Sequence, residues 1–591
     1  MKNKPFYFRR IVTTIIDLSL IYCISLLLQP IIYKVDFEKN IDIFIFVFLL
    51  YYSLSYSFLN GRTPAKILTS LKIIKQNNTH FPLKNIIARE IILKGIFGLI
   101  IPTYFIEKIF SVWSSLFTLI LFTIILISSL LFLFIFKRPW WEQLSQTVTI
   151  KTNITRKKDL KYAFLFITLI LTNSIIKTVY PFIFGKEELK NSLSPSYPVN
   201  KKTAIYSDFI KTHSQKPEDY IFDLFKTNDI IVISERMHPE YSQYEMIFNL
   251  ISDDRFTKYI GNIFTECGSV SFQDTLKSYL NTHFTSNEQL NINTSNLDRN
   301  SNAVWPLWSN TNQYDFFETV NKLNFSLPDS TKINWYFTDL PVNWETKSHK
   351  QFIKDYTNPQ RDSFMASSII EKYNNIISKE KRKKALVIMN TRHGYGLIDN
   401  RFGKRIKSEY YGTTAFLMNA FPKKVANIML NTVSLKYGFL FTPVQNGKWE
   451  TAFSIVDNPN VGFNFNGSPF GDDKFDLAFL SAPNLTYKDV FTGFIFYNPL
   501  RKHFQKDGFP NEFENFEDTI LRRSALVSQS HLNTIKSEIA YQKLYPKEPI
   551  FSESLKYGYL YNLIRVILIP LILLIIFFVS AIIFLNAYRR I

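Results

Sequence analysis

The sequence predicts an α-helical membrane domain, an α/β extracytoplasmic domain with a mostly parallel sheet, and a C-terminal transmembrane helix. Three observations support this prediction. Six apolar runs of roughly membrane length lie towards the two ends of the 591-residue chain. Between them, short strand-like runs alternate with amphipathic helical runs. The basic excess lies beside the apolar runs, because residues 186–560 carry 44 Lys and Arg against 41 Asp and Glu, whereas the remainder carries 25 against 8.

The apolar runs set the predicted domain boundaries. A membrane helix needs about 20 mostly apolar residues. The predicted spans are Ile11–Tyr33, Ile41–Leu59, Ile91–Phe105, Val112–Phe136, Tyr162–Phe184 and Tyr561–Tyr588. The predicted domains are therefore a four-span domain at 1–155, a fifth helix at 156–185, the α/β domain at 186–558 and the last helix at 559–591. The sequence leaves open whether the short third run spans fully.

Lysine and arginine near the span ends predict the orientation. The N-terminus and the loops at 61–90 and 137–161 are rich in these residues, so we expect all three in the cytoplasm. The large domain is then extracytoplasmic, both termini are cytoplasmic, and the protein is a multi-pass protein of the plasma (inner) membrane. We expect no cleavable signal peptide, because Asp17 interrupts the first apolar run. The predicted partners are the lipid bilayer and an unidentified small-molecule substrate. The net charge of +20 is explained by membrane orientation, so no nucleic-acid partner is expected.

Charged residues in the first part of the chain form a pattern. Arg10 and Asp17 lie seven residues apart, on one face of the first helix, and Glu142 follows the fourth span within Trp141–Val148. With the loop Gly61–Lys66, this pattern resembles the RDD family over about residues 5–152. Glu142 stands where that family has its second Asp, and Ala65 where it usually has Gly. The resemblance implies a membrane domain, with transport proposed for some members. The three charged residues are expected either to pair or anchor structurally, or to line an ion path.

Four strand-type runs predict the sheet of the second domain. They are Ile230–Ile233, Ile260–Thr265, Ile333–Phe337 and Ala385–Met389. Helical patterns at Tyr244–Ile251 and Phe364–Ile377 lie between them, which favours parallel strands. Ligands bind beyond the carboxyl ends of such strands.

Polar residues follow these strands. Glu235 and His238 come after the first strand, Glu266 ends the second, Asp339 ends the third, and His393 follows the fourth. Histidine and carboxylate groups suit proton transfer in hydrolysis, so the predicted catalytic residues are Glu235, His238, Glu266 and His393. The two histidines and two glutamates are also suitable Zn or Mn ligands, but no His-Glu-x-x-His pattern supports a metal, and none is predicted. With only Cys23 and Cys267, the chain is not expected to form a disulfide scaffold or a Cys-based zinc site.

The order of these motifs resembles the erythromycin-esterase-like and ChaN/Tiki-like superfamily over roughly residues 215–435. The matching positions are Glu235-x-x-His238, Glu266, the stretch 308–324, Asp339, Arg361–Ala366 and His393. The resemblance implies that His238 is the general base, that Glu235 and Glu266 position water or substrate, and that His393 completes the site. Asp339 and Arg361 are expected to bind substrate or to support the fold. Two positions depart from the family: Ser234 replaces a Gly, and Tyr244–Ile247 stands where esterase members carry an Arg.

Two functions remain open at this point. The first is a membrane-anchored extracytoplasmic hydrolase that activates water with Glu and His. The second is a module that binds haem or another small molecule, coupled to an RDD-type transport or anchoring domain. No cofactor is predicted, with a divalent metal or haem as open alternatives. The turn-dense segment Asn466–Asp473 is expected to be a surface loop or a cap over the site.

Overall fold

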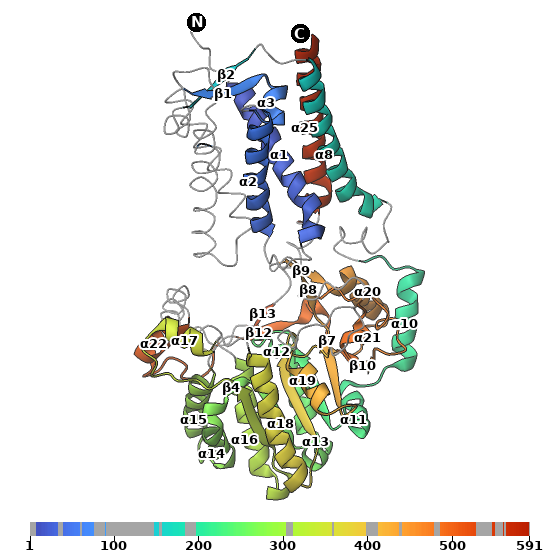
Figure 1. The fold of residues 1–591 in the computed structure, drawn as a ribbon. Coiled ribbons are helices and arrows are strands. Elements are labelled where there is room, and N and C mark those ends of the chain that lie inside the picture. Colours follow the sequence, from blue (N-terminus) through green and yellow to red (C-terminus); the bar gives the residue numbers. More distant parts are fainter. Residues whose placement is uncertain are drawn as a thin grey trace. The chain divides into compact units, whose positions relative to one another are not determined.

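Long apolar runs and short strand-type runs separate into two units of the chain. The computed structural model describes residues 7–32, 40–59, 62–75, 89, 147–152, 157–183, 197–302, 311–356, 360–396, 412–436, 440–477, 485–506, 508–527, 547–549, 560 and 563–589 (Figure 1). Unit 1 comprises Met1–Leu193 with Leu560–Ile591, and unit 2 comprises Ser194–Tyr559.

Unit 1 is mainly helical, which confirms the prediction of a helical N-terminal region. Its described elements are α1 (Tyr7–Ile32), α2 (Asn40–Phe58), α3 (Pro64–Leu68), β1 (Leu71–Lys75), β2 (Thr147–Lys151), α8 (Lys157–Ile183), the π-helical turn Ile564–Leu568 and α25 (Ile569–Arg589). Four of the predicted spans coincide with α1, α2, α8 and α25. The predicted spans Ile91–Phe105 and Val112–Phe136 lie outside the described residues.

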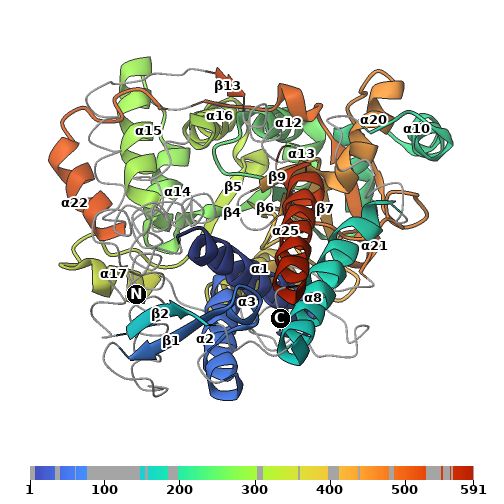
Figure 2. The same ribbon diagram turned by 90° about the horizontal axis from the view of Figure 1, so that it is seen from above.

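Two described helices are long and apolar enough to cross a membrane, namely Lys157–Ile176 and Ile569–Arg589, and Val12–Ser25 is a shorter apolar helix. The helices α8 and α25 lie side by side (Figure 2), and the Phe164 ring stacks on that of Phe584 with 4.4 Å between centroids. Such aromatic stacking adds to the packing of two apolar surfaces.

Unit 2 contains the predicted parallel sheet. Among its described residues, seven strands pair in the order β10-β11-β7-β3-β6-β4-β5. Their bounds are β3 (Ile230–Glu235), β4 (Asn262–Ser269), β5 (Asn334–Asp339), β6 (Ala385–Asn390), β7 (Val425–Leu430), β10 (Val461–Asn464) and β11 (Gly493–Phe496). All neighbouring pairs are parallel except β10 with β11. The sheet is thus mostly parallel, as predicted. Two small antiparallel pairs join β8 (Val433–Lys436) to β9 (Leu440–Pro443) and β12 (Phe504–Lys506) to β13 (Lys547–Pro549).

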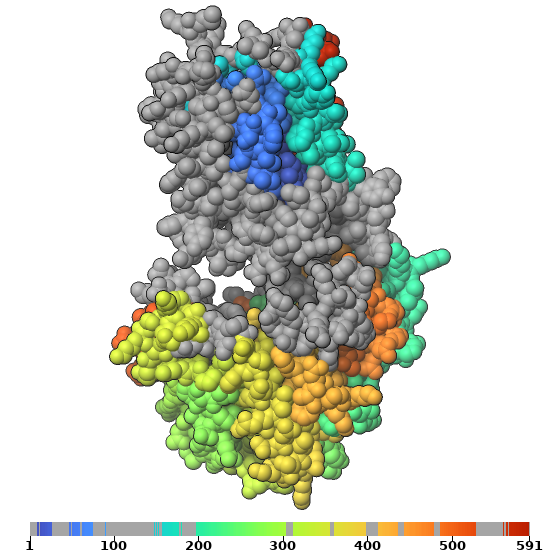
Figure 3. Space-filling model, in the orientation of Figure 1, coloured from blue at the N-terminus to red at the C-terminus, as the bar shows by residue number. Residues whose placement is uncertain are grey.

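Helices cover both faces of this sheet, because successive strand residues point to opposite faces. Ile231 and Ile233 of β3 belong to a core formed with α11–α16, whereas Ile230 and Val232 pack against α18 and α19. The helices are α10 (Lys201–His213), α11 (Pro217–Thr227), α12 (Tyr241–Ser252), α13 (Asp254–Tyr259), α14 (Gln273–Asn281), α15 (Asn287–Ser301), α16 (Thr311–Ser326), α17 (His349–Tyr356), α18 (Arg361–Lys379), α19 (Thr413–Ala420), α20 (Lys448–Ile455), α21 (Tyr487–Val490) and α22 (Glu517–Val527). On the face drawn in Figure 3, the yellow surface of α18 lies beside the orange surface of α19.

A separate aromatic core lies beside β10 and β11. It includes Phe465, Phe470 and Trp449, and the Asp473 carboxylate accepts hydrogen bonds from Trp449 Nε1 at 2.6 Å and Lys448 Nζ at 2.5 Å. The turn-dense segment 466–473 is a surface loop only in part, because Asn466, Gly467 and Asp472 are exposed whereas Ser468, Phe470 and Gly471 are buried. The one aromatic side chain of the segment, Phe470, anchors it in this core.

Strand β4 is irregular where it approaches the rim of the sheet. Its pairing register with β5 shifts between Thr265 and Ser269, which marks a bulge. Gly268 has a φ of +122°, and a Cβ placed there would lie 2.0 Å from Cδ1 of the buried Phe337. Only glycine therefore fits at this position without a shift of the neighbouring core.

We predict that Gly268→Ala destabilises the protein by at least ~2 kcal/mol, through backbone strain and overpacking against Phe337. The matched control is Gly467→Ala, because Gly467 also has a positive φ, of +78°, but a Cβ added there would meet no heavy atom within 4 Å. That control is expected to cost only about 1 kcal/mol. Denaturant unfolding of both variants measures the difference, and equal losses would contradict the prediction.

Candidate active site

Neighbouring strands bring the predicted site residues to one edge of the sheet. The strands β3, β6, β4 and β5 are consecutive in the sheet, and their carboxyl ends therefore lie at the same edge. Glu235 and Asp339 end β3 and β5, Glu266 lies within the bulged end of β4, and His393 follows β6.

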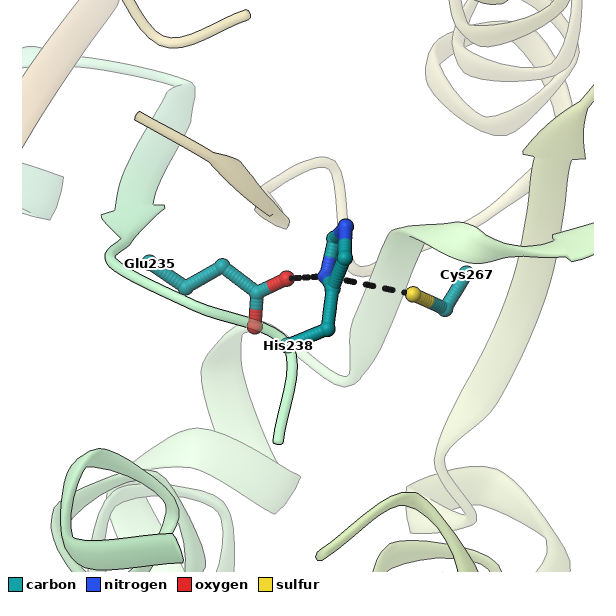
Figure 4. A group of neighbouring side chains, drawn as sticks. All are labelled: Glu235, His238 and Cys267. Atoms are coloured by element: carbon teal, nitrogen blue, oxygen red, sulfur yellow. Dashed lines mark hydrogen bonds and ion pairs between the residues drawn. The ribbon is translucent and has the colours of Figure 1, made fainter. Parts of the chain in front are cut away.

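His238 is held between two acidic side chains. Its Nδ1 is hydrogen-bonded to Glu235 Oε1, and its Nε2 lies 3.5 Å from Glu266 Oε1. The Sγ of Cys267 lies 3.3 Å from the same Nδ1 (Figure 4). The hydroxyl of Tyr244, on α12, donates to Glu235 Oε2 at 3.1 Å. These contacts restrict the ring and both carboxylates, so the proton-transfer groups are held in one arrangement.

The Glu266 carboxylate is the centre of the cluster. The backbone N–H of Asn390 donates to its Oε2 at 2.7 Å. Its Oε1 lies 3.1 Å from His393 Nε2 and accepts a hydrogen bond of 3.1 Å from Arg361 Nη2. One buried oxygen thus has His238, His393 and Arg361 around it.

Acidic partners orient the cationic side chains around Glu266. Arg361 donates to both Asp339 oxygens, from Nε at 2.7 Å and from Nη2 at 2.9 Å. His393 Nδ1 lies 2.6 Å from Asp362 Oδ1, which also accepts from the Thr413 N–H at 2.8 Å. A bidentate pair of this type restricts the guanidinium geometrically as well as stabilising it.

The cluster shifts the protonation of its members. Burial alone would raise the pKa of Glu266, but His393, His238 and Arg361 outweigh it and hold that pKa well below its usual range. Burial likewise opposes charge on His393, yet Glu266 and Asp362 raise its pKa. For His238, burial is outweighed by Cys267, Glu235 and Glu266, so its pKa is also raised. Burial raises the pKa of the Cys267 thiol to about 11. The raised pKa of both imidazoles and the lowered pKa of Glu266 have a common cause, because each imidazole lies within 3.5 Å of the same carboxylate oxygen.

A second buried network positions the segment that carries His238. Glu240, just after it, accepts hydrogen bonds from Ser242 Oγ at 2.8 Å and from the Tyr497 hydroxyl, and lies 3.1 Å from His503 Nδ1. The amide of Asn312, on α16, donates to the His238 carbonyl at 2.5 Å. Side chains from distant parts of unit 2 thus fix this short segment between β3 and α12.

The structure brings Glu235, His238, Glu266 and His393 together, with Asp339 and Arg361 beside them. Asp339 contacts the cluster through Arg361, from which both of its carboxylate oxygens accept hydrogen bonds. Sequence reasoning did not assign Cys267, Tyr244 or Asp362 to the site. Cys267 was considered only for disulfides and Cys-based zinc sites, although its place directly after Glu266 was the available signal.

Two of the three charged residues predicted in unit 1, Arg10 and Asp17, have contacts among the described residues. Arg10 Nη2 donates to the Thr149 carbonyl of β2 at 2.9 Å. Asp17 accepts from the Tyr51 hydroxyl at 2.6 Å and lies 3.6 Å from Lys66 Nζ. Lys66, expected in a cytoplasmic loop, is buried against the helices of unit 1. Glu142 lies outside the described residues.

Comparison with known proteins identifies the first part of the chain. The model of the RDD family matches residues 4–149, so this region is an RDD family domain and the protein is membrane-associated. Among curated proteins, none matches the sequence. The family is therefore shown for the N-terminal region alone.

Two solved structures show a weak likeness to the chain. One is a Bacillus cereus protein, with 10% identity and a TM-score of 0.32, covering 50% of this chain and 97% of that one. The other is a succinoglycan biosynthesis protein, with 12% identity and a TM-score of 0.31, covering 52% of this chain and 95% of that one. Likenesses of this strength carry no argument about function.

The burial of Glu450, which interacts with His503 of the network around Glu240, predicts that the free energy of unfolding depends on pH. Burial raises the pKa of nearby Glu450 from 4.5 to about 7, although His503 and the Leu500 N–H favour its charged form. Because the folded chain holds this proton more tightly than the unfolded chain, the free energy of unfolding should fall as pH rises from about 4.5 to about 7. The expected loss is on the order of 3 kcal/mol.

Glu450→Gln should flatten this part of the pH profile, because glutamine does not titrate. Thermal midpoints of the full chain in detergent, measured from pH 4.5 to 8, test the expectation. Glu345→Gln is the control, since the side chain of Glu345 is 86% exposed. If Glu450→Gln and Glu345→Gln retain the same profile as the unmodified chain, Glu450 is not the titrating group.

Proposed function

We propose that the protein is a membrane-anchored extracytoplasmic hydrolase, in which unit 2 activates water through Glu and His. The observation that carries the proposal is the placement of His238, with Nδ1 bonded to Glu235 and Nε2 directed at Glu266. An imidazole oriented by a carboxylate at one nitrogen, with the other nitrogen available for proton transfer, is a recurring hydrolytic arrangement.

The proposed reaction uses His238 as the proton carrier. Its Nε2 takes a proton from a water molecule, and the resulting hydroxide attacks the carbonyl carbon of an ester or amide. The imidazolium then passes the proton to the leaving group as the carbon–heteroatom bond breaks. Glu235 stabilises the imidazolium during this transfer, as a carboxylate partner does in other hydrolases.

Arg361 and His393 supply the positive charge for the reaction. Both lie at Glu266 Oε1, and a substrate oxygen that gains negative charge next to them would be stabilised electrostatically. Asp339 keeps the guanidinium in place through its two hydrogen bonds. Glu266 then orients water or substrate between the two imidazoles.

The resemblance to the erythromycin-esterase-like and ChaN/Tiki-like superfamily supports the same roles. When the motifs of this superfamily are matched in order to the chain, His238 corresponds to the general base. Glu235 and Glu266 correspond to the carboxylates that position water. Tyr244 stands near the place of the missing arginine, and its hydroxyl binds Glu235 instead. That substitution supports a substrate different from that of the esterases.

Loss of His238 or Glu266 should abolish hydrolysis. We expect His238→Ala and Glu266→Gln to lower turnover of a cleaved ester or peptide roughly 100-fold or more, since each removes a proton-transfer or positioning group. Turnover by the full chain in detergent is measured on an ester and peptide panel, with and without a chelator. His283→Ala serves as control, because His283 stacks on the exposed Phe325. Unchanged turnover in both His238→Ala and Glu266→Gln would contradict the proposed mechanism.

The proposed location requires residue 200 to lie outside the cytoplasm. The RDD domain and two apolar helices long enough to cross a membrane support a membrane location. The apolar runs and basic loops of the sequence support six spans, with both termini cytoplasmic and unit 2 extracytoplasmic. A compartment-sensitive reporter fused after Asn200 should therefore give the extracytoplasmic signal, and one fused after Arg589 the cytoplasmic signal. A cytoplasmic signal at Asn200 would overturn the six-span arrangement.

A further inference from the structure

We propose that Glu235, His238 and Cys267 bind one zinc-type divalent metal ion. Each residue offers one donor atom, and the three donor atoms lie within 4.8 Å of one another. Figure 4 shows the imidazole of His238 between the Glu235 carboxylate and the Cys267 thiol. Tetrahedral zinc has metal–ligand bonds of about 2.0–2.3 Å, which separates its ligand atoms by roughly 3.3–3.7 Å. The 3.3 Å between His238 Nδ1 and Cys267 Sγ matches that spacing, whereas Glu235 Oε1 and Nδ1 lie closer together, so the carboxylate has to move away from the ring when the ion binds.

Hydrogen bonds alone do not account well for this convergence. A single ring nitrogen carries either one proton or one lone pair, so it makes one strong hydrogen bond. Here Nδ1 of His238 faces both a carboxylate oxygen and a sulfur. A cation at the point where the three atoms converge would satisfy the nitrogen lone pair, the carboxylate and a thiolate together.

The neighbours of these residues are those of metal ligands. A histidine that binds a metal almost always donates its other N–H to a carboxylate or carbonyl. Nε2 of His238 lies 3.5 Å from Glu266 Oε1, which leaves Nδ1 to bind the metal. The Tyr244 hydroxyl holds Oε2 of Glu235 at 3.1 Å, which leaves Oε1 for the same position. Both orienting contacts come from outside the three ligands.

The mixture of donors selects the metal. A thiolate does not suit Mg²⁺ or Ca²⁺, which take oxygen ligands, whereas zinc binds sulfur, nitrogen and oxygen together. Three protein ligands leave a fourth position for water or substrate, as in catalytic zinc sites. Cys267 is partly exposed, whereas Glu235 and His238 are buried. As the metal–sulfur bond forms, the thiol proton leaves to solvent.

This proposal goes against the expectation from the sequence that no Cys-based zinc site forms, because one thiolate is sufficient when Glu235 and His238 supply the other ligands. The inference does not rest on the proposed hydrolysis, since metal binding is measured without turnover. If both hold, the metal would activate the water in place of His238, and Glu266 and His393 would remain as the neighbouring acid and base groups.

Cobalt binding to the full chain tests the inference. The protein in detergent is stripped with a chelator and titrated with Co²⁺. One equivalent should bind, giving the visible bands of a four-coordinate ion and a thiolate-to-cobalt charge-transfer band in the near ultraviolet, and Zn²⁺ should displace it. Cys267→Ser should remove the charge-transfer band, whereas Cys23→Ser, which alters the other free cysteine, should keep it.

Two further variants keep the test decisive if Cys267→Ser fails to fold. Glu235→Gln should retain the charge-transfer band with weaker binding, and Glu266→Gln should weaken binding about 10- to 100-fold. Failure of the unmodified chain to bind Co²⁺, or an unchanged band in Cys267→Ser, would overturn the inference. Metal binding without turnover of any substrate would support the metal site and contradict the proposed hydrolase. Turnover without metal binding would support the hydrolase and contradict the metal site.

Discussion

The buried carboxylate of Glu266 is the group around which the site of unit 2 is organised. A carboxylate is costly to bury unless charges and hydrogen bonds compensate it. Here one oxygen meets His238, His393 and Arg361, and the other accepts a backbone N–H. His238, His393 and Arg361 are in turn bonded to Glu235, Asp362 and Asp339, so a second set of carboxylates orients the groups that surround Glu266.

The bulge in β4 explains how two adjacent residues can serve the same imidazole. In a regular strand, successive side chains point to opposite faces of the sheet. The register shift between Thr265 and Ser269 breaks this alternation, and Gly268 adopts a φ that other residues rarely adopt. Glu266 then approaches Nε2 of His238 while Cys267 approaches Nδ1. Without the bulge, only one of the two side chains would face the ring.

Charged side chains have different surroundings in the two units. In unit 2 they lie together at the edge of the sheet, where the proposed substrate or metal ion would bind. In unit 1 the carboxylate of Asp17 is paired with Lys66 and hydrogen-bonded to Tyr51, which offsets the cost of an acid on an apolar helix. Arg10 instead ties the start of α1 to the β2 strand. Both arrangements stabilise the RDD domain locally.

The local sequence pattern was enough to predict the strands Ile230–Ile233 and Ala385–Met389. It also predicted the helical N-terminal region and the polar residues at the strand ends. These features were predictable because the periodicity of apolar side chains is a property of short segments. The convergence of Glu235, His238, Glu266 and His393 was predictable to the extent that parallel strands share one edge. The sheet order, which places β6 between β3 and β4, could not be read locally. Nor could the contact of Cys267 with His238, the pairing of Lys66 with Asp17, or the burial of Phe470 in a segment of turn residues. Each of these depends on which distant side chains pack together, and that is decided only when the whole chain is folded.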